Sequence, residues 1–187
     1  TGLGVIYVCE KAMELKGLKM AGSRIVVQGF GNVGSFAAKF AHERGARIIA
    51  VSDVSGGYFN GDGLNITDMI EYVKANKSLK GYTKAQVISN EQLLELECDA
   101  LLPCALEGQI DTHNAEKIKA KLIIEGANGP VTNAATKILD QRGVFIAPDV
   151  IANGGGVIVS YFEWVQDIMS FFWEEQDVDT KLKGVIL

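Results

Sequence analysis

Hydrophobic positions along the chain follow two alternating periods. Five short apolar runs begin near residues 24, 47, 99, 122 and 144, and they are rich in β-branched residues and leucine with little polar alternation. Such runs are typical of strands in a parallel sheet that is buried on both faces. The segments between them carry apolar residues at helical spacing. The pattern therefore predicts one α/β domain of alternating strands and helices.

Glycines and short polar residues mark the expected helix ends. A helix from Thr1 to about Lys16 should end before Gly17, and the same order of helix, glycine and strand recurs at Gly45 and Gly143. Further helices are expected over residues 65–73, 90–97, 114–120 and 133–141, the first two capped by their opening asparagines. Residues 56–63 predict a small turn-rich hairpin.

The last segment predicts one long C-terminal helix that follows the glycines at 154–156. Its apolar positions recur at helical intervals, at Val157, Tyr161, Val165, Ile168 and Phe172. Trp164 and Trp173 are expected in the core or in an interface. Because the sequence begins and ends abruptly, we expect it to be part of a larger protein.

The clearest candidate for chemistry is the stretch Gly29-Phe30-Gly31-Asn32-Val33-Gly34, which follows the first apolar run and opens a helix. Backbone N–H groups at such a helix start bind anions, most simply a pyrophosphate. In this motif Gly29 allows the tight turn, Gly31 the approach of the phosphate, and Gly34 the packing of helix on strand.

Asp53 strengthens the prediction of a dinucleotide site. It ends the second apolar run, 24 positions after Gly29, and a carboxylate about 20 residues after the first glycine binds the adenosine ribose in this type of fold. The alternative is a structural turn followed by an aspartate that caps a local segment. Strand, glycine loop, helix, strand and acid together favour the dinucleotide.

Unusual sequence collects at the expected carboxyl ends of the strands, where ligands bind in open parallel sheets. We treat these segments as one site: the glycine motif, Asp53, residues 103–106, residues 126–128 and residues 148–153.

Composition narrows the function further. The net charge of −5 argues against nucleic acid as a partner. No apolar run approaches the ~18 residues that span a membrane, and no signal-peptide pattern opens the sequence, so we expect a cytoplasmic protein. The three cysteines lack zinc-type spacing with the two histidines. We therefore expect reduced thiols and no metal site.

Taken in order, the motifs resemble the cofactor-binding domain of the glutamate dehydrogenases. They are Thr1-Gly2-x-Gly4-Val5, the glycine motif, Pro103-x-Ala105-Leu106-Glu107, Glu125-Gly126-Ala127-Asn128-Gly129-Pro130, and residues 148–164 with Ser160-Tyr161-Phe162-Glu163-Trp164. The resemblance covers essentially residues 1–187. It implies an α/β, Rossmann-type, doubly wound and mostly parallel sheet flanked by helices, with the substrate and catalytic domain absent from this chain.

The resemblance also implies a role for each matched residue. Gly29, Phe30, Asn32 and Val33 would follow the pyrophosphate, Asp53 would hold the adenosine ribose, and Ala105 would line the adenine. Asn128 would bind the ribose of the nicotinamide half. Thr1 and Asn153 would form hydrogen bonds with the carboxamide group of the nicotinamide ring. Ser160 would contact the side-chain carboxylate of glutamate.

By the same resemblance, the intact enzyme would be a hexamer that reversibly converts L-glutamate and water to 2-oxoglutarate and ammonium. The family's proton-transfer lysines and aspartate lie on the other domain, so we name no catalytic residue here and expect this chain alone to be inactive. We expect the side chains of Lys39, Lys74 and Lys137 to lie on polar helix faces, with their charges in solvent. Asp53 favours NAD, since its charge repels the 2′-phosphate of NADP, although NADP stays open.

Two alternatives remain at this point. The first is the same domain of a leucine, valine or phenylalanine dehydrogenase. The second is a stand-alone dinucleotide-binding module.

Overall fold

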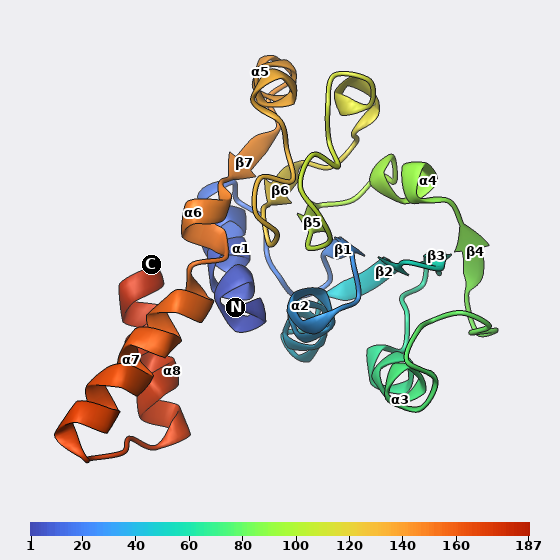
Figure 1. Cartoon of the computed structure of the whole chain (residues 1–187). Helices are drawn as coiled ribbons and strands as arrows, with labels where there is room; N and C mark the ends of the chain where they lie inside the picture. The colour runs from blue at the N-terminus through green and yellow to red at the C-terminus, as the bar shows by residue number, and fades with distance from the viewer.

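A single seven-stranded sheet organises the chain, in the order β4-β3-β2-β1-β5-β6-β7 (Figure 1). A computed structural model describes all 187 residues. The strands are β1 Arg24–Gln28, β2 Arg47–Asp53, β3 Gly56–Phe59, β4 Gln86–Ile88, β5 Ala100–Pro103, β6 Leu122–Ile124 and β7 Phe145–Ala147. All pairings from β2 through β1 to β7 are parallel, whereas β3 and β4 extend the β2 edge antiparallel. The predicted doubly wound, mostly parallel sheet is confirmed.

Helices cover both faces of this sheet (Figure 1). They are α1 Gly2–Leu15, α2 Asn32–Glu43, α3 Ile66–Asn76, α4 Asn90–Leu94, α5 Asn133–Gln141, α6 Asp149–Ala152, α7 Gly155–Met169 and α8 Glu175–Ile186, with a 3₁₀ turn η1 Ala115–Lys117. Helices α1, α2 and α3 pack on one face, and α4, α5 and η1 on the other. The sheet is therefore buried on both sides, as its unbroken apolar strands require.

Two hydrophobic cores result from the alternation of side chains along the strands. In β1, Ile25 and Val27 enter the first core with α1 to α3, and Val26 enters the second core with α4 and α5. Each core also holds a cysteine, Cys9 in the first and Cys98 in the second. Burial raises the pKa of both thiols to about 12.

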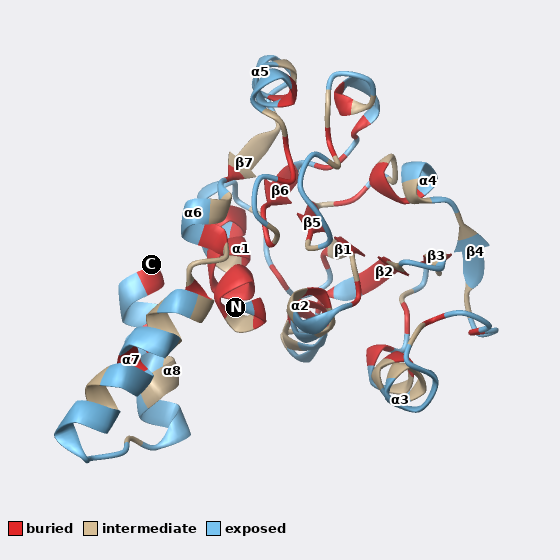
Figure 2. Ribbon diagram, in the orientation of Figure 1, coloured by how far each residue is buried: buried red, intermediate tan, exposed pale blue.

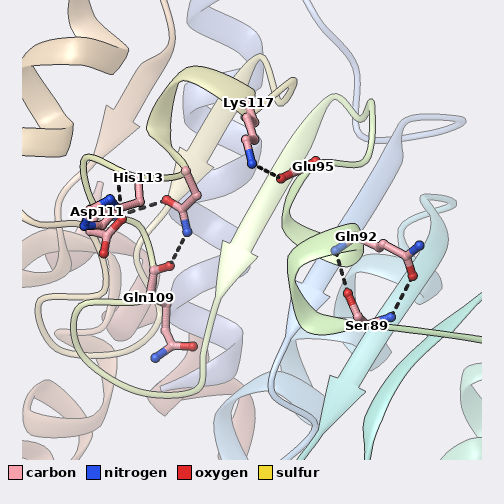
Figure 3. A network of polar contacts seen from close by, with 8 residues as sticks. Ser89, Gln92, Glu95, Gln109, Asp111, His113 and Lys117 are labelled. Carbon is pink, nitrogen blue, oxygen red and sulfur yellow. Dashed lines mark hydrogen bonds and ion pairs between the residues drawn. The ribbon is translucent and has the colours of Figure 1, made fainter.

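Most expected helix ends are confirmed. Gly17, Gly45 and Gly143 all have positive φ, at 69°, 83° and 75°, in the left-handed conformation that ends a helix. The Asn65 side chain caps α3 by accepting from the Asp68 backbone N–H. The expected Asn90 cap is wrong, because the preceding Ser89 forms a reciprocal capping box with Gln92 (Figure 3).

Other local expectations need correction. Residues 56–63 form no hairpin of their own, because β3 pairs back onto β2 through the turn at residues 54–55 and then onto β4. The three residues of β4 carry no apolar alternation that would reveal a strand. The segment 114–120 forms only the one-turn η1, and α4 ends at Leu94 rather than near 97.

The expected long C-terminal helix is two helices. Ser170 takes φ +48° and ends α7, and the Gln166 side chain accepts from the Trp173 N–H, so the chain turns back as α8. Both helices extend beyond the sheet and are largely exposed (Figure 2). On the predicted apolar face Tyr161, Ile168 and Phe172 are exposed. Trp164 is also exposed rather than in the core of this chain, while Phe162 is buried against Trp173.

Candidate functional site

The strand order reverses at the boundary between β1 and β5. From β1 the chain crosses over to β2 on one side, and it later returns to β5 on the other side. The loops that follow β1 and β5 therefore diverge at their carboxyl ends, which is where open α/β sheets bind ligands. We call the region between these diverging loops the crevice. At its base, a hydrogen bond of 2.8 Å from the Cys104 N–H to the Gln28 carbonyl joins the ends of β5 and β1.

The glycine motif forms the β1 side of the crevice. Gly29 takes φ +89°, and a Cβ built there would lie 2.9 Å from the Ala105 backbone. A Cβ on Gly34 would overlap the Gly29 carbonyl oxygen, so this glycine permits the close approach of α2 to β1. A Cβ on Gly31 would meet nothing within 4 Å. Gly31 thus faces open space, unlike the two glycines that the fold itself requires.

The backbone N–H groups at this turn are free. No N–H from Phe30 through Gly34 donates to another group of the chain, and the first bonded amide is that of Ser35, which donates to the Gly31 carbonyl at 2.9 Å. These donors lie at the positive end of the 12-residue helix α2. The glycine turn is open and presents hydrogen-bond donors, so it could hold a diphosphate group.

Asp53 stands at the carboxyl end of β2 but already has partners in the chain. Its Oδ1 accepts from the Ser55 N–H at 2.8 Å and from the Ser55 hydroxyl at 2.5 Å, and its Oδ2 accepts from the Leu79 N–H at 2.6 Å. A carboxylate has about four acceptor positions. One therefore remains for a ribose hydroxyl, and the carboxylate also holds the 77–82 loop on the end of β2.

Polar side chains connect the loops that follow β6 and β7. The Asn153 Nδ2 donates to the Asn128 Oδ1 at 2.7 Å, which brings together two residues predicted for the nicotinamide half. Asp149 accepts from the Gly129 N–H, and the buried Glu125 accepts from the Asp149 N–H, each at 2.8 Å. Glu125 and Asp149 belong to the sequence motifs, but no role was predicted for either residue. Their position directly after two strands was the available signal.

Burial raises the pKa of Glu125. The hydrogen bond from the Asp149 N–H opposes this shift, and the nearby Asp149 charge adds to it. Since burial dominates, the site holds a carboxyl group whose charged form is disfavoured.

Thr1 reaches the site because α1 crosses α7 with little separation. A Cβ on Gly4 would lie 3.2 Å from the Gly155 Cα, so the two backbones are in direct contact. The Thr1 hydroxyl lies against Gly156, three residues after Asn153 in the chain. Ser160 follows on α7 with its side chain exposed, and the structure shows no hydrogen bond to it.

The sequence profile of the glutamate, leucine, phenylalanine and valine dehydrogenases matches residues 1–186. The chain belongs to this dehydrogenase family. It is 46% identical over 187 residues to the catabolic NAD-specific glutamate dehydrogenase RocG of Bacillus subtilis, covering all of this chain and 44% of that protein. It is 48% identical to a glutamate dehydrogenase of Thermotoga maritima, covering 100% of this chain and 45% of the relative. The chain thus spans less than half the length of these relatives.

Solved structures give the same family likeness. A hetero-hexameric glutamate dehydrogenase of Thermus thermophilus superposes with a TM-score of 0.92 at 33% identity, covering 99% of this chain and 44% of that one. A Plasmodium falciparum glutamate dehydrogenase superposes with a TM-score of 0.90 at 26% identity, covering 99% of this chain and 42% of that one. This member of the dehydrogenase family contains no helix with the length and apolarity needed to cross a membrane.

Proposed function

We propose that this chain is the NAD-binding domain of a glutamate dehydrogenase. The observation that carries the proposal is the row of free backbone N–H groups at residues 30–34, which lies where the strand order reverses. A diphosphate bound there would place its adenosine half toward Asp53 and its nicotinamide half toward Asn128, Asn153 and Thr1. When bound, the nicotinamide carries the hydride of the reaction.

The chain's own residues would bind and orient, not move protons. Lys39, Lys74 and Lys137 are exposed on helix surfaces, and none of them is buried as a proton-transfer group would be. We therefore assign the proton-transfer groups of the reversible deamination of L-glutamate to 2-oxoglutarate and ammonium to a separate domain. Ser160 would contact the substrate carboxylate from α7. In the intact enzyme we infer a homo-hexamer, in keeping with the hetero-hexameric relative.

NAD is proposed over NADP because the Asp53 charge lies where a 2′-phosphate would approach. The NAD-specific designation of the Bacillus relative supports this choice. Both of these relatives are glutamate dehydrogenases, which also favours glutamate over leucine, valine or phenylalanine as the substrate.

Fluorescence titration of the 187-residue chain with NADH and NADPH tests the proposal. We expect saturable NADH binding that is tighter than NADPH binding, and no turnover of L-glutamate with NAD. Absence of NADH binding by the folded chain would contradict the cofactor assignment, and deamination by the pure chain would contradict the division between domains.

A further inference from the structure

Three amide side chains meet behind the glycine turn, on the sheet face that carries α4. Gln28, the last residue of β1, is only 1% exposed. Its Nε2 donates to the Asn90 Oδ1 at 2.9 Å and to the Gln109 Oε1 at 2.8 Å. Asn90 begins α4, and Gln109 lies in the segment after β5. This amide cluster therefore joins three separate parts of the crevice wall through one buried side chain.

The amide cluster carries an unpaired polar atom. The Gln28 Oε1 is the one buried side-chain oxygen or nitrogen in the 187 residues that has no hydrogen-bond partner. A buried acceptor without a donor destabilises the folded state. The Nε2 of the same side chain makes two hydrogen bonds, so this glutamine combines an unpaired acceptor with a link between Asn90 and Gln109. Such exceptions are concentrated at functional sites.

Gln109 extends the connection to the loop at residues 105–107. Its Nε2 donates to the Glu107 carbonyl at 3.3 Å, and no other hydrogen bond within the chain involves the backbone of residues 105–107. This loop touches the glycine turn, since a Cβ on Gly29 would lie 2.9 Å from the Ala105 backbone. The position of the loop against Gly29 therefore depends on Gln109, and through it on Gln28.

The two segments that contact Gln28 have further hydrogen bonds of their own, and Figure 3 shows the Ser89–Gln92 pair in one and the contacts of Gln109 in the other. The capping box of Ser89 and Gln92 fixes the first turn of α4, where Asn90 lies. The Asn114 Nδ2 donates to the Gln109 carbonyl at 2.9 Å, and its Oδ1 accepts from the Asp111 N–H at 3.0 Å. The amide cluster thus connects two anchored segments to the end of β1.

We propose that Gln28 and Gln109 are positioning residues for the adenosine half of the dinucleotide. They hold the 105–107 loop at a fixed separation from the Gly29 turn, and so set the width of the crevice on the adenine side. This role rests on the proposed dinucleotide function. It concerns one half of the ligand, so its failure can be separated from failure of that function.

The test compares ligands that contain or lack adenosine. Gln28→Met and Gln109→Met replace each amide by an apolar side chain of similar length, and Gln109, being only partly buried, gives a variant that keeps the core intact. Calorimetric titrations would use NADH, ADP-ribose and reduced nicotinamide mononucleotide. The matched control is Gln141→Met at an exposed position at the end of α5.

We expect Kd to rise about tenfold for NADH and ADP-ribose in either variant, within the range that one lost network contact produces. The double variant should show no further loss, since both residues act through one connection. Affinity for the mononucleotide should stay near that of the control in both variants, and the thermal midpoint of Gln109→Met should stay near that of the control as well. Unchanged ADP-ribose binding in folded Gln109→Met, or an equal loss with the mononucleotide, would overturn the positioning role. Failure of the unaltered chain to bind NADH would instead refute the proposed function.

Discussion

Replacing Gly31 with alanine separates cofactor binding from folding. Gly31 has φ −82° and ψ −159°, which alanine readily adopts, and a new methyl group would meet no atom of the chain within 4 Å. Reduced freedom of the unfolded chain stabilises such a variant by about 0.4–1 kcal/mol. Alanine is also the poorer residue at a helix N-cap, at a cost of similar size. We therefore expect the free energy of unfolding to change by less than about 1 kcal/mol.

Binding should respond much more strongly. The methyl group would project into the open space at the glycine turn, where the proposed diphosphate would lie. Hydrogen bonds to charged groups contribute about 1.5–3 kcal/mol each. Losing one or two of them would raise the Kd for NADH by about 100-fold, which corresponds to about 2.7 kcal/mol.

The assay is a fluorescence titration with NADH alongside urea unfolding of the same preparation. Gly184→Ala in α8 is the control, because its added methyl group also meets nothing within 4 Å and lies outside the proposed site. An unaltered Kd for NADH in folded Gly31→Ala would refute the reasoning that a diphosphate occupies this turn.

Three further outcomes follow from the same geometry. Gly34→Ala should fail to fold stably, because its methyl group would overlap the Gly29 carbonyl oxygen, and circular dichroism on heating checks this. Asp53→Ser should shift the ratio of Kd values toward NADPH, and loss of the bonds to Ser55 and Leu79 should lower the unfolding free energy by about 1–3 kcal/mol. Burial raises the pKa of Glu125 in the folded state, so this residue favours folding below its unfolded pKa of about 4.3, and that contribution is lost as the pH rises through the folded pKa. Urea unfolding between pH 4 and 7 should show that Glu125→Gln removes this pH dependence, and an identical pH profile for both proteins would contradict the assignment.

The parallel sheet was predictable because its strands are continuous apolar runs, and because glycines mark the ends of the helices between them. Helix α1 and the glycine turn follow local rules that depend on few distant contacts. The antiparallel β4 was not predictable, since residues 86–88 are mostly exposed and gain their strand conformation by pairing with β3. Likewise, the break at Ser170 depends on the Gln166 side chain reaching the Trp173 N–H, a contact that hydrophobic periodicity cannot reveal.

The sequence predicted which strand ends form the candidate site, but it did not predict the hydrogen bonds that connect the residues there. Sequence placed Asn128 and Asn153 after different strands, and only the fold brings them within 2.7 Å. Sequence marked Asp53 as a ribose ligand but could not show that the Leu79 N–H binds it as well. The sequence analysis gave Gln28 no role, because its contacts with α4 and with the segment after β5 form only when these segments pack together.

The three cysteine thiols give the chain intrinsic chemical reporters. Cys9 and Cys98 are buried in different cores, whereas Cys104, next to Ala105, is partly buried, and desolvation raises its pKa to about 12 as well. A thiol of such high pKa reacts slowly with maleimide until opening of the structure exposes and ionises it. The alkylation rates of Cys9 and Cys98 would therefore report how often each core opens, and the rate of Cys104 would report the opening of the crevice. No label would have to be introduced.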